Sequence, residues 1–512
     1  MVTQIPVIDI FAGPGGLGEG FSAYVAKGNP AFKIKLSIEK DTTAHQTLEL
    51  RAFYRQFPVS AVPVEYYQHL RGENNIDKPA LFAKYPKEAA AAKQEAWMAT
   101  LGEADRVLVK QRINEALNGA LNWVLIGGPP CQAYSLVGRS RMIGEDRGKY
   151  ETDPRHFLYR EYLHILAEHQ PPVFVMENVK GLLSSEINQQ RTFELILADL
   201  RNPSKAVGEK DYLSLSYKLF SISRENPENL EEIKPEDFVV HSEEYGIPQA
   251  RHRIIILGIR SDVYKTKPKL LTKIEKPVPI ESVIGDLPRL RSGLSKEEDT
   301  AEEWRDAIKE IENAKWVKSN HLGLGDSVKS ALRRVGASLN RGGSFISTDA
   351  TPDKYCEWYV DKKIRGVCNH ETRAHIREDL HRYFFAAIFA REMKRSPTLS
   401  DFPKELLPNH GNVSYAQKDT KFNDRFRVQI SGRPATTVVS HISKDGHYYI
   451  HYDPSQCRSL TVREAARLQT FPDNYFFEGN RTQQYHQVGN AVPPLLANKI
   501  AEIVYNVLEG SK

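Results

Sequence analysis

Residues 5–18 read Ile-Pro-Val-Ile-Asp-Ile-Phe-Ala-Gly-Pro-Gly-Gly-Leu-Gly, an apolar run that passes directly into a glycine-rich loop. The run predicts a buried strand, and the residues after the loop have the character of a helix. Gly13, Gly15 and Gly18 form a G-x-G-x-x-G arrangement, with Gly16 inside it, and this arrangement lets a ligand approach the backbone closely. Strand, loop and helix in this order predict a doubly wound α/β sheet with a nucleoside-cofactor site at the loop.

Glu39 supports the same prediction. It follows a second predicted strand, residues 33–38, and lies about 20 residues beyond the loop. A carboxylate at this place in a nucleotide-binding sheet accepts hydrogen bonds from the ribose hydroxyls. Taken alone, the site suits NAD and S-adenosylmethionine equally well, and a tight turn followed by a surface glutamate is the alternative.

Cys131 lies in a rigid turn after a further predicted strand. Residues 127–135 read Gly-Gly-Pro-Pro-Cys-Gln-Ala-Tyr-Ser and follow the apolar run 123–126. A thiol presented from the carboxyl end of a strand suits a nucleophile, because the glycines and prolines fix the turn around it. The alternative is a buried cysteine that acts only as a small apolar residue.

Two further segments bring charged residues to strand ends. Glu177 follows the apolar run 173–176 and shares an edge with Cys131 if the sheet is parallel, where a partly desolvated carboxyl could serve as a general acid. Arg251 and Arg253 precede the apolar run 254–259, and alternation places them on one face. They suggest an anion or a carbonyl-rich base as the target. The alternatives are a salt-bridged or helix-capping carboxylate and two solvated arginines.

Six blocks together resemble the cytosine-C5 DNA methyltransferases of the bacterial restriction-modification type. They occur in the family's order across residues 5–500. The blocks are Asp9-Ile-Phe-Ala-Gly-Pro-Gly-Gly16, Pro129-Pro-Cys-Gln132, Glu177-Asn-Val179, Gln249-x-Arg-x-Arg253, Arg463-Glu-Ala-Ala-Arg-Leu-Gln-Thr-Phe-Pro472 and Gln487-Val-Gly-Asn-Ala-Val-Pro493. A nucleophile block, an acid block and an arginine block in this order are far more specific than any one motif.

The resemblance implies a SAM-dependent methyltransferase sheet of the Rossmann-like kind, with a smaller target-recognition domain inserted in it. We expect a catalytic domain at 1–260, a DNA-binding recognition domain at 261–454, and a segment at 455–512 that completes the catalytic domain. The helix predicted at 494–508 is apolar on one face and could pack beside the first strand.

The resemblance also implies the chemistry of the site. Cys131 would add to carbon 6 of a cytosine flipped out of duplex DNA, so that carbon 5 accepts the methyl group of S-adenosylmethionine. Glu177 would hold N3 and the exocyclic amine, and Arg253 would bind O2. Arg251 would support the nucleophile pocket or contact a phosphate. Tyr134 stands where a phenylalanine is more usual in the family.

The cofactor residues follow from the same resemblance. Phe11 would stack on the adenine, Glu39 would accept the ribose hydroxyls, and Asn490 with Val492 would close the pocket together with Pro129 and the glycine loop. The family usually holds the adenine with an acidic residue after the third strand. Residues 62–67, which we place at that point, offer no clear counterpart.

About 200 residues between Arg253 and Arg463 carry no family block, and we expect them to recognise the target sequence. Residues 321–400 hold 14 Lys and Arg against 9 Asp and Glu, which suits contacts with phosphates. The segment 341–344 is a plausible phosphate-binding loop. Aromatic residues are interleaved with the basic ones, and a solvated helix face over an aromatic core is the alternative. These aromatic residues are Tyr355, Trp358, Tyr359, Tyr383 and Phe384.

Other features set looser limits. Cys356, Cys368, His370 and His375 lie within twenty residues, but their spacing does not follow zinc-site pairing, so we expect no metal. Residues 79–120 read as a helical insertion of unknown purpose, and residues 295–318 as an acidic amphipathic helix between the lobes.

Composition predicts a large, two-lobed protein of the reducing cytoplasm. The chain has 512 residues, 40% of them hydrophobic, and its four cysteines form no disulfide framework. The first strand begins too early for a signal peptide, and no apolar run approaches the roughly 18 residues of a membrane span.

Three other functions stay open at this point. A tRNA cytosine-C5 methyltransferase would share the catalytic residues, a non-catalytic nucleic-acid-binding protein could keep the fold, and a nicotinamide oxidoreductase would explain only the first 40 residues. A restriction endonuclease that acts on the same DNA site is a possible partner implied by the resemblance.

Overall fold

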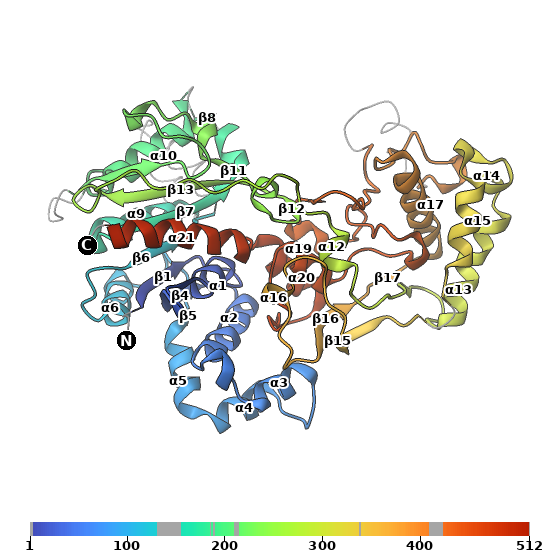
Figure 1. Ribbon diagram of the computed structural model, residues 1–512, viewed down its shortest axis with the longest axis horizontal. Helices are drawn as coiled ribbons and strands as arrows, with labels where there is room; N and C mark the ends of the chain where they lie inside the picture. The colour runs from blue at the N-terminus through green and yellow to red at the C-terminus, as the bar shows by residue number, and fades with distance from the viewer. Residues whose placement is uncertain are drawn as a thin grey trace.

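The N-terminal strand β1 (Ile5–Ile10) lies inside an eight-stranded sheet, which Figure 1 shows in the sheet-containing lobe. The computed structural model describes residues 4–130, 155–184, 186–187, 190–208, 215–336, 339–408 and 423–510. The strands of the sheet are ordered β10-β13-β7-β6-β1-β4-β5, and β11 also pairs with β13. Their bounds are β4 Phe32–Glu39, β5 Ala96–Met98, β6 Val124–Gly127, β7 Val173–Val179, β10 Tyr217–Phe220, β11 Val239–His241 and β13 His252–Arg260.

The strands from β7 to β5 run parallel, whereas β13 runs antiparallel to β7. The carboxyl ends of β6 and β7 therefore meet at one edge, as the sequence predicted. Because β13 runs the opposite way, its beginning reaches that same edge, and Arg253 pairs in register with Val179. The antiparallel direction of β13 explains why the arginines at its start lie next to the carboxyl ends of β6 and β7.

Helices cover both faces of the sheet, which confirms the predicted doubly wound α/β fold. Along β1, Ile5 and Val7 belong to one buried cluster and Ile8 and Ile10 to another, as strand alternation requires. The first face packs against α1 (Gly16–Ser22) and α21 (Pro494–Gly510). The second packs against α6 (Arg106–Leu117), α9 (Arg155–His169) and α10 (Thr192–Arg201).

The last helix, α21, completes the lobe that the first strand begins. It lies along α1, and Leu496, Ala497 and Ile500 share a buried cluster with Val7 and Phe21. Figure 1 shows both chain ends in this lobe. The predicted helix at 494–508 is therefore present, and it packs on the sheet beside β1 through α1.

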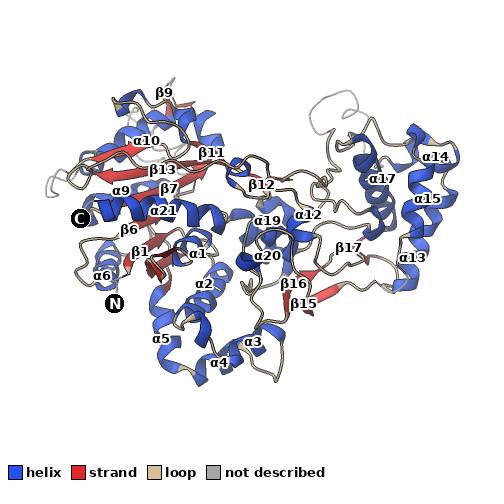
Figure 2. Ribbon diagram, in the orientation of Figure 1, coloured by secondary structure: helices blue, strands red, loops and turns tan. Residues whose placement is uncertain are grey.

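The second lobe is mostly helical and irregular (Figure 2). Its far end is a bundle formed by α13 (Ala301–Lys309), α14 (Lys315–Lys318), α15 (Gly325–Arg333) and α17 (Arg377–Met393), which share a buried cluster. Between the bundle and the sheet lie α12 (Glu281–Ile284), α16 (Cys356–Tyr359), α19 (Val462–Leu468) and α20 (Arg481–Asn490), with the hairpin of β15 (Gly342–Ser347) and β16 (Gly366–Glu371). Short pairs add β12 (Gln249–Ala250) with β18 (Ala435–Thr436) and β14 (Gly293–Leu294) with β17 (Ala374–His375).

The third strand of the cofactor half differs from the prediction. Residues 62–67 belong to no strand, and α3 (Val64–Arg71) begins there. The strand that pairs in parallel with β4 is β5, which lies inside the segment 79–120. The flanking α2 (Thr42–Arg55), α4 (Lys78–Lys84) and α5 (Pro86–Glu95) pack into one cluster with it. The segment is therefore not a mere helical insertion, because it supplies a strand to the main sheet.

Two predictions about the inserted region are wrong in detail. Residues 295–318 form two short α-helices and a 3-10 turn in the distal bundle, with Trp304 fully buried, and not one helix at a hinge. Residues 342–344 begin strand β15, while Arg341 is held by Asp299 at 2.9 Å and by the carbonyl of Thr372 at 2.9 Å. Both terminal nitrogens of the Arg341 guanidinium are already bound, so this side chain is not free to bind a phosphate.

The aromatic residues of this region lie mainly in the core, which corrects the expectation that they face DNA. Tyr359, Tyr383 and Phe384 are fully buried. Trp358 donates its indole N–H to the carbonyl of Thr470 at 2.8 Å, and the hydroxyl of Tyr355 donates to the carbonyl of Gly246 at 2.8 Å. These contacts join the inserted region to the rest of the chain. Within the described residues, no helix is long and apolar enough to cross a membrane.

Candidate active site

The glycine loop packs closely against a segment from the last part of the chain. Gly13 and Gly15 have positive φ values of 58° and 89°, and Gly16 and Gly18 lie in the first turns of α1. A Cβ on Gly16 would overlap the carbonyl oxygen of Val492, so only glycine permits this close approach. Above Gly13, by contrast, a Cβ would meet no atom of the described residues within 4 Å. The loop is therefore packed on one side and open on the other.

Glu39 lies beside the open side of the loop. Its Oε2 accepts the N–H of Gly13 at 2.7 Å, and its Oε1 accepts the N–H of Asp41 at 2.8 Å. Burial raises the pKa of this carboxyl, and the backbone N–H groups of Asp41 and Gly13 oppose the rise. Phe11 precedes the loop at a positive φ of 55° and is half-buried. A carboxylate, an aromatic ring and an open glycine loop are the groups that a nucleoside-containing cofactor needs.

Asp9 is a residue whose environment the sequence reading did not anticipate. It lies on the face of β1 that α1 covers, it is 1% exposed, and neither carboxylate oxygen has a hydrogen-bond partner among the described residues. Burial raises its pKa to about 8, and Arg55 and the nearby Gly18 N–H offset only part of that rise. The signal in the sequence is an acid inside an otherwise apolar strand.

The C-terminal cofactor residues arrive through α20. Val492 is 7% exposed and lies over Gly16, whereas Asn490, the last residue of α20, is exposed. The helix is attached to α2 by a hydrogen bond of 2.6 Å from the hydroxyl of Thr47 to the side chain of Gln487. The segment that follows α20 thus adjoins the glycine loop through Val492.

The loop after β6 is held to the end of β7. Asn178 is 4% exposed and donates its side-chain N–H to the carbonyl of Pro129 at 2.8 Å. A Cβ on Gly128 would overlap the carbonyl of Glu177, so the two strand ends touch backbone to backbone. Cys131 follows two residues after Pro129 and lies outside the described residues, as does Tyr134. Asn178 belongs to the Glu-Asn-Val block, and its hydrogen bond ties the loop after β6 to the end of β7.

Glu177 and Arg253 form an ion pair at this edge. Nε of Arg253 lies 3.0 Å from Oε1 of Glu177, and the two side chains are only 11% and 17% exposed. Arg253 also donates to the carbonyl of His252 at 2.9 Å. From the sequence, a salt-bridged Glu177 was the alternative to a free acid. The structure contains that salt bridge, and its two members are the two candidate residues, both largely buried.

Arg251 has a different environment from Arg253. It is 1% exposed and donates to the carbonyls of Val438 at 2.6 Å and Gly489 at 3.2 Å. Burial, followed by the charge of Arg253, lowers its pKa well below the usual range. The expected phosphate contact does not fit a side chain this enclosed. Its bonds instead join the start of β13 to two segments near the chain's end, which agrees with a supporting role.

Of the cysteines and histidines considered for a zinc site, Cys368, His370 and His375 are buried, and Cys356 is a free, half-buried thiol. Both ring nitrogens of His370 are engaged, by the hydroxyl of Thr461 at 2.8 Å and the carbonyl of Pro288 at 2.9 Å. The thiol of Cys368 donates to the carbonyl of Leu70 at 3.7 Å, and burial raises its pKa to about 12. His370 and Cys368 serve as buried core contacts.

Comparison with known proteins decides which chemistry this edge belongs to. The family pattern described as C-5 cytosine-specific DNA methylase matches residues 109–203 and 234–506, more than half of the chain. The chain belongs to the C-5 cytosine-specific DNA methylase family. Members are S-adenosylmethionine-dependent methyltransferases that act on DNA, so the chain is a DNA (cytosine-5-)-methyltransferase.

Two relatives illustrate the relationship. The Type II methyltransferase M.Bpa9945I of Bacillus paralicheniformis is 32% identical over 98% of this chain and 99% of its own length. The DNA (cytosine-5-)-methyltransferase M.ApeKI of Aeropyrum pernix is 28% identical over 77% of this chain and 83% of its own. The family membership confirms the resemblance seen in the six blocks. The tRNA-directed, non-catalytic and nicotinamide alternatives are correspondingly less supported.

Proposed function

We propose that this methyltransferase modifies carbon 5 of a flipped-out cytosine within one short duplex DNA sequence, with Cys131 as the nucleophile. The observation that carries the proposal is the meeting of three strand ends at one edge. Asn178 fixes the loop that leads to Cys131, and Glu177 pairs with Arg253 beside it. Attack, proton transfer and charge stabilisation each have a candidate group there.

The chemistry of cytosine explains the division of labour. Its carbon 5 becomes nucleophilic only after a thiolate adds to carbon 6, and Cys131 would form that bond. After methyl transfer, loss of the carbon 5 proton would break the bond to carbon 6 and release Cys131 as the thiolate. Glu177 would bind N3 and the exocyclic amine, where charge changes on addition, and Arg253 would bind O2. Nε of Arg253 lies 3.0 Å from Oε1 of Glu177, so one guanidinium could pair with the acid through its charge and contact the base with its remaining N–H groups. Arg251 would act as a positioning residue through its carbonyl bonds.

The cofactor residues fit S-adenosylmethionine. When bound, that cofactor supplies an electrophilic methyl group on a sulfonium. Glu39 would turn its carboxylate to the ribose hydroxyls, and the open space over Gly13 leaves room for ligand atoms. Phe11 would stack on the adenine, and Gly15, Gly16, Gly18, Pro129, Asn490 and Val492 would form the walls. The adenine's polar edge would lie near the end of β5, where Met98, Ala99 and Thr100 offer no carboxylate.

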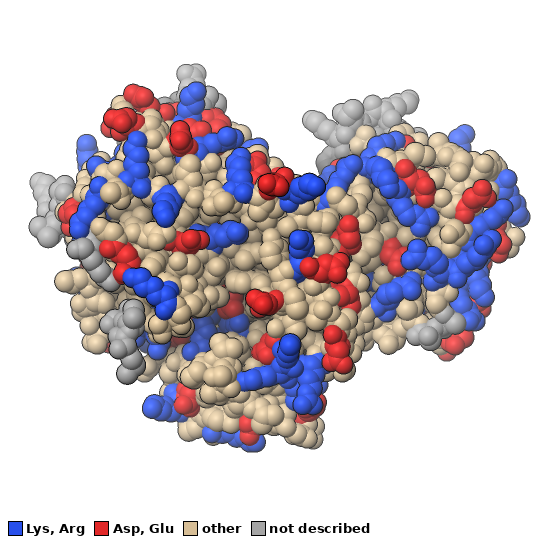
Figure 3. All heavy atoms as spheres, viewed as in Figure 1, with Lys and Arg blue, Asp and Glu red and all other residues tan. Residues whose placement is uncertain are grey.

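Target recognition would fall to the second lobe. Figure 3 shows the molecule hollowed between the two lobes, with Lys and Arg side chains on both sides of the hollow. β11 and β12 lie at the side of the sheet that faces this lobe (Figure 1). We keep the division into a catalytic domain at 1–260, a recognition domain at 261–454 and a closing segment at 455–512 as part of the proposal. A restriction endonuclease that cuts the same site would be the partner, because several relatives are named type II methyltransferases.

The test is a methylation map. Purified protein is incubated with unmethylated plasmid DNA and S-adenosylmethionine, and 5-methylcytosine is located by bisulfite sequencing. We expect one short recurring site, lost in Cys131→Ala and kept in Cys356→Ala, whose cysteine is also free and only half-buried. Methylation that survives Cys131→Ala would refute the nucleophile. Methylation of tRNA but not of DNA by the folded protein would refute the DNA substrate.

A further inference from the structure

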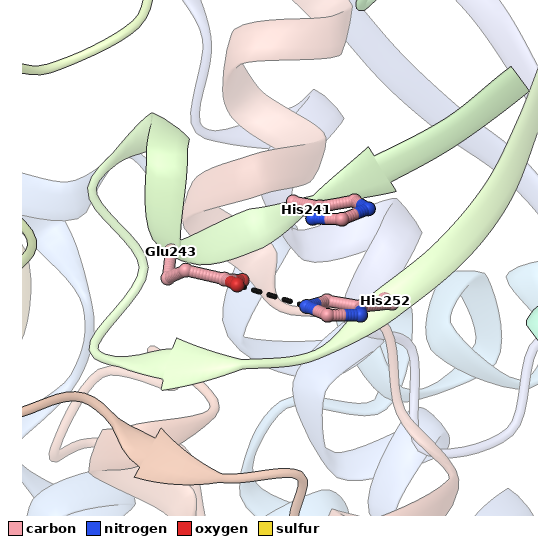
Figure 4. A group of neighbouring side chains, drawn as sticks. All are labelled: His241, Glu243 and His252. Atoms are coloured by element: carbon pink, nitrogen blue, oxygen red, sulfur yellow. Dashed lines mark hydrogen bonds and ion pairs between the residues drawn. The ribbon is translucent and has the colours of Figure 1, made fainter. Parts of the chain in front are cut away.

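Two histidines face each other across a strand pair next to Arg253. His241 on β11 and His252 on β13 are direct register partners in the antiparallel ladder. Their rings are stacked, with centroids 4.0 Å apart and planes at 14°. Glu243 lies in the turn that follows β11, and Figure 4 shows its carboxylate directed at the ring of His252. Two strands and a turn thus bring three ligand-type side chains together.

The distances are those that one ion can bridge. One ligand atom from each of the three residues can be chosen so that all lie within 4.8 Å of one another. Metal–nitrogen and metal–oxygen bonds of about 2.0–2.1 Å in a tetrahedral site place neighbouring ligands roughly 3.3 Å apart. Binding an ion would therefore draw the ligand atoms closer together and turn at least one imidazole out of the stack, so that both ring nitrogens point at the ion. Two imidazoles and one carboxylate favour Zn²⁺, Co²⁺ or Ni²⁺ over Mg²⁺ or Ca²⁺, which prefer oxygen ligands.

Part of the bonding capacity of this cluster is unused. Oε1 of Glu243 lies 2.8 Å from Nε2 of His252, but Oε2 of the same carboxylate is buried and has no hydrogen-bond partner among the described residues. The side chains of His241 and His252 are 39% and 32% exposed, so an ion and its water can reach them. A buried, unpaired carboxylate oxygen costs free energy that a cation would recover.

The surrounding charges permit a cation. The carboxylate of Glu243 lies 2.8 Å from Nε2 of His252, so a negative charge stands beside the two imidazoles. Glu244 lies 3.8 Å from Nδ1 of His241 and is itself paired with Lys273, so it can orient the ring from outside.

We propose that His241, Glu243 and His252 form a binding site for one divalent transition-metal ion, with Zn²⁺ as the best match and a water molecule as the fourth ligand. The ion would join β11 to β13 one register step from Arg253, whose partner on β11 is Val240. It would thereby stiffen the strand that presents Arg253 to the site. The proposal does not depend on the methyl-transfer proposal, because metal binding is measured without DNA or cofactor.

The experiment uses the untagged full chain carrying Cys131→Ser and Cys356→Ser, so that neither the proposed nucleophile nor the half-buried thiol of Cys356 can bind metal. Co²⁺ is titrated and followed by its visible absorption, and Zn²⁺ is then used in competition. We expect one equivalent of Co²⁺, displaced by Zn²⁺, and a Zn²⁺-dependent rise in Tm. Binding should weaken at least tenfold in His252→Ala and in the isosteric Glu243→Gln, and stay unchanged in His486→Ala, which removes an exposed histidine elsewhere.

Two results would overturn the proposal. One is the absence of saturable Co²⁺ binding by the folded chain. The other is binding of the same strength after His241→Ala and His252→Ala, since the ion would then lie at another place. Far-UV circular dichroism of each variant separates lost binding from lost folding, and Glu243→Gln keeps the size of the side chain if a histidine variant fails to fold.

Discussion

Replacing Asp9 with Asn should make the stability of this protein less dependent on pH. Burial on the α1 face of β1 raises the pKa of Asp9 to about 8, against an ordinary value of 3.8. Between these two values the folded chain keeps a proton that the unfolded chain has lost. The free energy of unfolding therefore falls as pH rises through this range, and the ionised, unpaired carboxylate is least tolerated above pH 8.

The magnitude follows from the width of that interval. Each unit of pKa difference corresponds to about 1.4 kcal/mol, so the full interval amounts to a ceiling of about 6 kcal/mol. Asp9→Asn keeps the shape of the side chain and removes its charge. The variant should unfold with nearly the wild-type free energy near pH 4, and it should be more stable by several kcal/mol at pH 9.

Urea unfolding at pH 5, 7 and 9, without cofactor, measures the difference. Asp306→Asn is the matched control, because that carboxylate is 63% exposed and its removal relieves no buried charge. If the difference in unfolding free energy between wild type and Asp9→Asn stays constant from pH 5 to pH 9, burial does not hold a proton on Asp9. If that difference shrinks as pH rises, the pKa of Asp9 is lowered by folding and not raised.

Three further substitutions test the packing and the site. Gly20→Ala should cost about 1–3 kcal/mol of unfolding free energy, because the added Cβ overlaps the backbone of α21. The control is Gly343→Ala, whose Cβ meets one atom of the described residues, at 3.6 Å, and which should be nearly neutral in thermal unfolding. Asn178→Ala should lower kcat roughly tenfold or more with little change in cofactor affinity by calorimetry, since it frees the Pro129 carbonyl; an unchanged kcat would remove Asn178 from the positioning role. Arg253→Lys should lower kcat/KM about 10²–10³-fold, because an ammonium cannot hold Glu177 and a base together; a loss below tenfold would argue against contact with the base.

The sequence predicted the central strands well because they are fully buried. The runs at 5–8, 124–127 and 173–176 are apolar without alternation, as strands covered on both faces must be, and the residues after them reach one edge. The strand β5 was missed for a physical reason. It has three residues, Ala96–Met98, between two helices, and so short a segment carries no detectable period.

Arg251 and Arg253 show that a local sequence pattern does not predict the environment of a side chain. The two residues have the same type and lie two positions apart, so alternation alone treats them equally. Their difference depends on the carbonyls of Val438 and Gly489, which lie about 190 and 240 residues further along the chain. Tyr383 and Phe384 illustrate the same limit, since an aromatic residue beside a basic one suits a buried core as well as a nucleic-acid surface.

The packing of α21 on α1 means that the first lobe cannot finish folding until synthesis is nearly complete. The buried cluster around Val7 and Phe21 stays open until Leu496 and Ile500 have left the ribosome. At about 5–20 residues per second, that wait is roughly half a minute to a minute and a half. Throughout it, this apolar face of the first lobe is covered by α1 without α21, so a chain halted before residue 494 should be a chaperone substrate, prone to aggregation at the surface that α21 later covers.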